Sequence, residues 1–148
     1  MFRPLGLAAL FAVTATAALA GPAMTVAKDP SCGCCTAWAA IMERAGYDVA
    51  IEHTTYDALD RLKAARGIPA TLAGCHTATV QGYTIEGHVP AADIDRLLAE
   101  RPDAVGLAVP GMPMGSPGMG PESSRDAYDV LLVMKDGTVE RFAHHPAR

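Results

Sequence analysis

The sequence predicts a single α/β domain in which a central mixed sheet is flanked by helices. Three observations lead to this fold class. Short apolar runs typical of strands alternate with stretches whose apolar residues recur at helical spacing. Strand-like runs also surround Gln81-Gly82 and Asp136-Gly137, which predicts two hairpins, the second of them C-terminal. The chain has 148 residues, enough for one hydrophobic core.

The first 20 residues have the pattern of a secretory signal peptide. Arg3 supplies a positive start, an apolar run extends from Leu5 to Leu19, and Ala18-Leu19-Ala20 offers small residues for cleavage. The alternative is an uncleaved anchor, but the run is short for a membrane span and no basic stop-transfer group follows. We therefore expect a signal peptide over residues 1–20, export to the periplasm, a domain over residues 21–148 and no stable membrane span after cleavage.

The individual elements follow from local patterns. Trp38 and Met42 share one face of the first helix, and Gly46 ends it. Thr55 can cap the second helix, and Pro90 fits the first helical position of the third. The predicted strands span residues 24–28, 48–52, 77–80, 83–86, 130–134 and 138–142, and the predicted helices span residues 34–45, 56–66 and 91–100.

A long Met/Pro/Gly loop follows the third predicted helix. Residues 109–124 contain four prolines and four glycines, a density that excludes regular secondary structure. Met112, Met114 and Met119 lie in this loop, which offers no periodic packing face. A thioether is a soft ligand that suits Cu(I) and not Zn, Mg or Ca. The alternative is a surface loop whose methionines simply pack down onto the protein.

Three of the four cysteines, Cys32, Cys34 and Cys35, lie between the first predicted strand and the first predicted helix. The positive end of a helix stabilises thiolates, which bind soft metals or exchange disulfides. Cys32 and Cys35 form a C-x-x-C pair. A third thiol between them would compete during disulfide exchange, whereas a thiolate cluster can use it to bridge soft cations such as Cu(I).

Three further residues are candidates for the same site. Cys75 is the fourth thiol, and its alternative role is that of a buried inert cysteine. The adjacent His76 is a candidate ligand, a donor to a ligand or an ordinary satisfied polar residue. His88 lies at a strand-to-helix corner, where a ligand role and a structural role are equally compatible with the sequence.

Several function classes are excluded. The net charge is −4 and no basic patch or stripe appears, which argues against nucleic-acid binding. The glycines of the long loop are broken by prolines and do not form a phosphate-binding loop. The chain contains neither a G-x-S-x-G nor an H-E-x-x-H motif.

The element order and the position of the C-x-x-C pair resemble thioredoxin-like proteins. Residues 66–72 resemble the X-Pro segment that precedes the third strand in those proteins. The resemblance implies a thioredoxin-like fold and a cis Ile68–Pro69 bond facing the cysteines. The C-terminal hairpin and the Met/Pro/Gly loop would then be additions to that fold.

Four motifs, in order, resemble the CopG-type periplasmic copper-resistance proteins. They are residues 29–35 with Trp38, residues 75–78, residues 82–91 and residues 110–119. The resemblance spans residue 24 to about residue 142 and implies copper binding and a role in copper detoxification. It also implies a metal-binding set whose ligands are cysteines and whose neighbours are a histidine and methionines, namely Cys32, Cys34, Cys35, Cys75, His88, Met112 and Met119.

Three functions are compatible with these residues. The first is a periplasmic protein that holds Cu(I) in a cysteine thiolate cluster, with Cu(I)/Cu(II) cycling or transfer to efflux or chaperone proteins as extensions. The second is a thiol–disulfide oxidoreductase. The third is a structural zinc site of cysteines and a histidine, which leaves the methionine loop unexplained. A binding protein is favoured over an enzyme, and copper-dependent oxidoreductase activity stays open.

Overall fold

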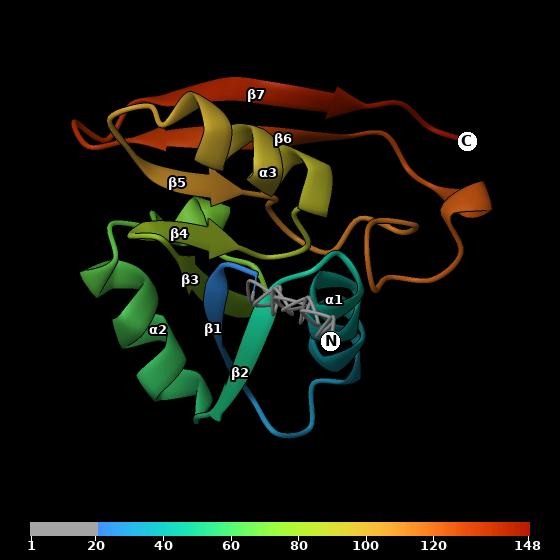
Figure 1. Cartoon of the computed structure of the whole chain (residues 1–148), viewed down its shortest axis with the longest axis horizontal. Coiled ribbons are helices and arrows are strands. Elements are labelled where there is room, and N and C mark those ends of the chain that lie inside the picture. Colours follow the sequence, from blue (N-terminus) through green and yellow to red (C-terminus); the bar gives the residue numbers. More distant parts are fainter. Residues whose placement is uncertain (1–20) are drawn as a thin grey trace, which may run out of the picture.

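The computed structural model describes residues 21–148, which form three helices and a seven-stranded mixed sheet of order β2-β1-β3-β4-β5-β6-β7 (Figure 1). The predicted signal peptide lies outside the described residues. Within residues 21–148, no helix has the length and apolar character needed to cross a membrane.

The first part of the sheet confirms the predicted thioredoxin-like fold. β1 (Ala23–Lys28), α1 (Gly33–Arg44), β2 (Asp48–His53) and α2 (Tyr56–Ala65) are followed by the hairpin of β3 (His76–Val80) and β4 (Tyr83–Glu86), and then by α3 (Ala91–Glu100). β1 runs parallel to β2 and antiparallel to β3, which is antiparallel to β4. The predicted elements of this part are all present, within a few residues at their ends.

A C-terminal extension continues the same sheet. β5 (Ala104–Ala108) is parallel to β4, and the antiparallel strands β6 (Tyr128–Met134) and β7 (Val139–His145) follow (Figure 1). The predicted C-terminal hairpin is confirmed. β5 was not predicted because its residues, Ala-Val-Gly-Leu-Ala, are small and do not alternate. Gly106 allows β5 to approach β4 closely, since a Cβ there would lie 1.8 Å from the Thr84 carbonyl oxygen.

The main core lies between the sheet and the helices α1 and α3. Trp38 and Met42 of α1 are fully buried, as the helical pattern predicted, and they pack with Met24 and Val26 of β1. Successive strand residues point to opposite faces. Thr77, which lies next to His76 in β3, therefore faces the other side of the sheet, where its side chain contacts Lys63 of α2.

The expectation of a cis bond before Pro69 was wrong, because all peptide bonds in residues 21–148 are trans. Pro69 instead precedes a short 3₁₀ helix, η1 (Ala70–Leu72), and its carbonyl accepts a hydrogen bond from the Leu72 N–H at 2.9 Å. The buried Ile68 side chain anchors this segment against Ala108 of β5. The segment thus resembles the thioredoxin X-Pro loop in position but not in backbone conformation.

Candidate metal centre

A tight turn presents the first cysteines at the start of α1. Cys32 is the N-cap of the helix, and its N–H donates to the Asp29 carbonyl at 3.1 Å. The Ser31 N–H donates to Asp29 Oδ1 at 2.8 Å, and Pro30 presets the backbone of the turn. The first turn of α1, residues 33–36, contains no acidic side chain. The positive end of the helix dipole therefore acts on the thiols.

The structure brings all four predicted cysteines together. Cys32 and Cys35 form a disulfide. The Sγ atom of Cys34 lies 3.5 Å from that of Cys32 and 3.7 Å from that of Cys75. All four sulfur atoms lie within 4.8 Å of one another. Because a disulfide cannot offer thiolates, this site presents two free thiols when oxidised and can present four after reduction.

His88 joins the sulfur cluster through Cys75. The Nδ1 atom of His88 lies 2.8 Å from the Pro117 carbonyl oxygen, and its Nε2 atom lies 3.2 Å from Cys75 Sγ. A carbonyl only accepts, so Nδ1 carries the proton and Nε2 presents its lone pair to Cys75. Burial lowers the pKa of His88, which keeps the ring neutral and able to bind a metal.

Cys75 is held in its thiol form. Burial, together with the neighbouring Cys34, raises the pKa of Cys75 to about 12. Its S–H group is therefore the donor in the contact with His88 Nε2. A soft cation that binds Cys75 must displace this proton, and the same movement would free the Nε2 lone pair of His88. The contact is thus well suited to be replaced by a metal ion.

His76 is the least satisfied side chain of this region. It is fully buried, and neither ring nitrogen has a hydrogen-bond partner among residues 21–148. One ligand atom each of Cys75, His76 and His88 lies within 4.8 Å of the others. Burial lowers the pKa of His76 well below its usual value. An orphaned neutral imidazole beside a thiol is what an absent metal ligand bond would leave, so the donor set fits a soft or borderline cation such as copper.

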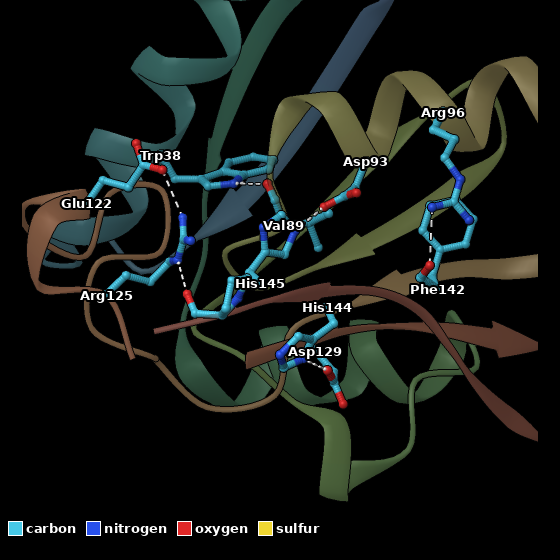
Figure 2. Close-up of polar contacts among 11 residues, drawn as sticks. Trp38, Val89, Asp93, Arg96, Glu122, Arg125, Asp129, Phe142, His144 and His145 are labelled. Carbon is cyan, nitrogen blue, oxygen red and sulfur yellow. Dashed lines mark hydrogen bonds and ion pairs between the residues drawn. The ribbon is translucent and has the colours of Figure 1, made fainter. Parts of the chain in front are cut away.

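Trp38 fixes the corner that carries His88. The Trp38 indole N–H donates to the Val89 carbonyl at 2.8 Å, as Figure 2 shows, and its ring centroid lies 4.4 Å from that of His76. The same large side chain therefore packs against one histidine and holds the backbone next to the other. This explains why a tryptophan follows the cysteine motif so closely.

The Met/Pro/Gly loop lies against the cysteine end of α1. A Cβ at Gly118, whose φ is +87°, would lie 2.7 Å from the Cys34 carbonyl oxygen, so the loop backbone touches the first turn. Pro117 of the same loop accepts the His88 hydrogen bond. Met112 is 56% exposed and Met119 is half-buried. The proposed roles of Met112 and Met119 in metal binding stay predictions.

A buried ion pair on the opposite side of the sheet supports the Cys75 segment. Glu86 accepts from Lys63 Nζ at 2.5 Å and from the Gly74 N–H at 2.7 Å through Oε1, and from the Thr77 hydroxyl at 2.7 Å through Oε2. This network was not predicted from the sequence. Its only signal was a pair of polar residues, Thr77 and Glu86, that face each other in the predicted β3–β4 hairpin.

The C-terminal end of β7 is tied to the rest of the fold by side-chain contacts. Figure 2 shows His144 with Asp129, and Arg125 with Glu122. His145 Nε2 lies 2.8 Å from Asp93 Oδ2 of α3. Both histidines thus contact carboxylates, which assigns His144 and His145 a structural role in this part of the chain.

The comparisons with known proteins agree with this geometry. Residues 72–119 match the model of a family described as "Protein of unknown function, DUF411". The comparison with curated proteins gives no significant match. Two solved structures of a copper resistance protein CopG are similar over most of the chain. Form 2 is 42% identical with a TM-score of 0.78, and the match covers 85% of this chain and 99% of that one.

Form 1 of the same protein is 41% identical with a TM-score of 0.79, and the match covers 84% of this chain and 98% of that one. Both matches combine substantial identity with nearly complete coverage of the solved chain. They agree with the fold and with the family that the sequence motifs resemble. This chain belongs to the CopG family of copper resistance proteins.

Proposed function

We propose that this chain is a periplasmic copper-binding protein that holds Cu(I) in a cysteine thiolate cluster and thereby contributes to copper resistance. The observation that carries the proposal is the convergence of four cysteine sulfurs at the N-terminal end of α1. Thiolates are the ligands that Cu(I) prefers, and a helix N-terminus favours their negative charge. The names of the similar solved structures point in the same direction.

The proposed ligands are Cys32, Cys34, Cys35 and Cys75 after reduction of the disulfide, with His88 beside Cys75. His76 is added because its buried nitrogens lack hydrogen-bond partners in the part of the chain that the structure describes. Met112 and Met119 would contribute thioethers from the loop that covers α1. Pro117 would fix the orientation of His88, since a hydrogen bond to Nδ1 leaves Nε2 for the metal.

Copper cycling is a natural extension of this site. The reduced pair Cys32/Cys35 can donate two electrons, so that two Cu(II) ions become two Cu(I) ions while the dithiol becomes the disulfide and releases two protons. Cys34 and Cys75 remain as free thiols in the oxidised form and could retain Cu(I). Mixing the reduced protein with Cu(II) tests this step: Cu(I) should appear in proportion to the thiols lost.

The binding proposal is tested by titrating the reduced mature chain with Cu(I) against a competing chelator. We expect retention of about one copper ion or more per chain. His88→Ala should weaken retention, whereas His53→Ala should not, because His53 is an exposed residue at the end of β2. Retention of less than one copper ion by the wild-type protein would refute the proposal.

A thiol–disulfide oxidoreductase is the second candidate, favoured by the Cys32–Cys35 disulfide on a thioredoxin-like fold. An insulin-reduction assay separates the two functions. Plain exchange needs only Cys32 and Cys35, so it should survive in Cys34→Ser. Loss of activity in that variant would instead indicate chemistry of the whole cluster.

A structural zinc site of cysteines and one histidine is a weaker alternative. A metal-selectivity titration of the reduced protein with Zn(II) and with Cu(I), each against a competing chelator, distinguishes it. A structural zinc site should bind one Zn(II) ion tightly in a closed tetrahedral set. Export and copper transfer to efflux or chaperone proteins belong to the same proposal. Fractionation of cells, with mass determination of the N-terminus, tests cleavage after Ala20.

A further inference from the structure

Lys28 is buried at the edge of the candidate metal centre. It is the last residue of β1 and only 1% exposed, and it is among the largest fully buried side chains of the protein. Its register partner in β3 is His76, the residue that follows Cys75. Its Nζ atom lies 3.5 Å from the carbonyl oxygen of Pro30, in the turn that leads to Cys32. Lys28 therefore lies between the two segments that carry the cysteines.

The two buried lysines of this region differ in their partners. Lys63 forms an ion pair with Glu86 and a second hydrogen bond with Thr77. Among residues 21–148, Lys28 forms no ion pair within 4.0 Å, and its one hydrogen bond is the long contact with the Pro30 carbonyl. The exposed carboxylate of Asp29, the next residue, interacts with its charge without forming an ion pair. A buried ammonium group that lacks an ion-pair partner is costly, so an anion placed beside it would stabilise it.

The anion that fits is the thiolate cluster itself. Four cysteines bring four negative charges when fully deprotonated, and each Cu(I) ion neutralises only one of them. A cluster that holds fewer Cu(I) ions than thiolates therefore carries a net negative charge. The Lys28 charge reaches this region, because it adds to burial, to His88 and to Lys63 in lowering the pKa of His76, as the smallest of these causes.

We propose that Lys28 is a positioning residue whose fixed positive charge counterbalances the anionic copper–thiolate cluster and so raises the affinity for Cu(I). This inference rests on the proposed function. It assigns a role to a residue that is not a ligand, because an ammonium group has no lone pair to offer a metal. In the absence of copper the same charge destabilises the fold. We thus expect Lys28 to lower the stability of the apo protein and to raise the stability of the copper-loaded protein.

The test compares Lys28→Met, which keeps the length and removes the charge, with Lys28→Arg, which keeps the charge. Cu(I) affinity is measured on the reduced mature chain against a competing chelator, and thermal unfolding is measured on the reduced apo protein. Lys28→Met should lose about tenfold in Cu(I) affinity, as expected for one charge that acts through the protein without contacting a ligand. Its apo form should unfold at the same temperature as the wild type or higher. Lys28→Arg should keep most of the affinity.

Two results would overturn the role of Lys28. One is wild-type Cu(I) affinity in Lys28→Met. The other is a parallel fall of apo stability and affinity, which would indicate an ordinary packing role. Lys28→Gln, a shorter neutral variant, provides the same comparison if the Met variant does not fold. If the wild-type protein itself fails to bind Cu(I), the proposed function falls and this inference with it, so the two failures are distinguishable.

Discussion

The thioredoxin-like part of the chain, from β1 to α3, and the C-terminal extension, from β5 to β7, make different contributions to the candidate metal centre. The first part supplies every cysteine and both histidines of the site. Within residues 21–148, the structure defines no contact between the cysteine sulfurs and a sulfur atom of the extension or of the loop within it. They supply the Pro117 carbonyl that orients His88 and the Gly118 backbone that covers Cys34.

This difference bears on the proposal that a thioredoxin-like scaffold binds copper here. A C-x-x-C turn that exchanges disulfides must remain accessible to a partner protein. Here a loop lies on the helix end that carries the cysteines, and a buried histidine faces the fourth thiol. The additions favour enclosure of a soft cation over docking of a substrate disulfide.

The largest expected effect comes from breaking the support beneath Cys75. Glu86→Gln leaves Lys63 buried without its counter-charge, which should cost about 3–5 kcal/mol of unfolding free energy. The variant should also loosen Gly74, whose N–H donates to Glu86, and thereby weaken Cu(I) binding. Denaturant unfolding and chelator competition measure the two effects.

A matched control for this prediction is Glu100→Gln. Glu100 pairs with Arg96 on the exposed face of α3, where both side chains are about half exposed, and the loss should be below about 1 kcal/mol. Equal losses in the two variants would contradict the role assigned to the buried network.

The contribution of the extension is tested by adding a methyl group where the loop contacts α1. Gly118→Ala places a methyl group 2.7 Å from the Cys34 carbonyl oxygen, at a φ of +87°. We expect a loss of about 1–3 kcal/mol and weaker Cu(I) binding, since the loop must move away from α1.

Gly111→Ala separates strain from contact. Gly111 has a φ of +70° but no atom within 4 Å of the added Cβ, so it carries the backbone cost alone. Copper affinity should stay unchanged in Gly111→Ala. Comparable loss of copper affinity in both variants would show that the loop acts through its general stability and not through its contact with Cys34.

The thioredoxin-like part was far more predictable than the extension. Its helices could be read from apolar residues at helical spacing, with Trp38 and Met42 correctly placed in the core. The meeting of Cys75 with the first cysteines could be inferred once the fold was assigned. β5 was not predicted because its residues show no alternation of apolar and polar side chains. The need for a glycine at position 106 becomes clear only from the close approach of the Thr84 backbone.

Other features depend on long-range contacts that no local pattern records. The Ile68–Pro69 bond is trans and a 3₁₀ turn follows Pro69, whereas the thioredoxin resemblance suggested a cis bond. Within residues 21–148, the buried His76 nitrogens have no hydrogen-bond partner and the buried Lys28 forms no ion pair, and neither property can be read from the residue types alone.

The histidines also give the apo protein a defined pH dependence. Burial lowers the pKa of both His76 and His88 in the folded state, while the unfolded value stays near 6.5. The stability that depends on their neutrality is therefore present above about pH 6.5 and is lost as the pH falls below it. His76→Phe should reduce this loss by up to about 1.4 kcal/mol per pH unit, as measured by denaturant unfolding between pH 7.5 and about pH 5. An unchanged slope would place the pH dependence in other groups.

The smallest effect on stability is expected in the methionine loop, and there copper affinity becomes the more informative quantity. Met112 and Met114 are both about half exposed, so replacing either with Leu should change the unfolding free energy by less than about 0.5 kcal/mol. Met112→Leu should nevertheless weaken Cu(I) retention, because the thioether is lost while the shape is kept. Met114→Leu serves as the control, since Met114 is not among the predicted ligands. Equal Cu(I) affinity in both variants would remove Met112 from the proposed ligands and leave Met119 as the one thioether proposed from the loop. The comparison between the two parts of the chain would then be sharper, because nearly all proposed metal contacts would come from the thioredoxin-like part.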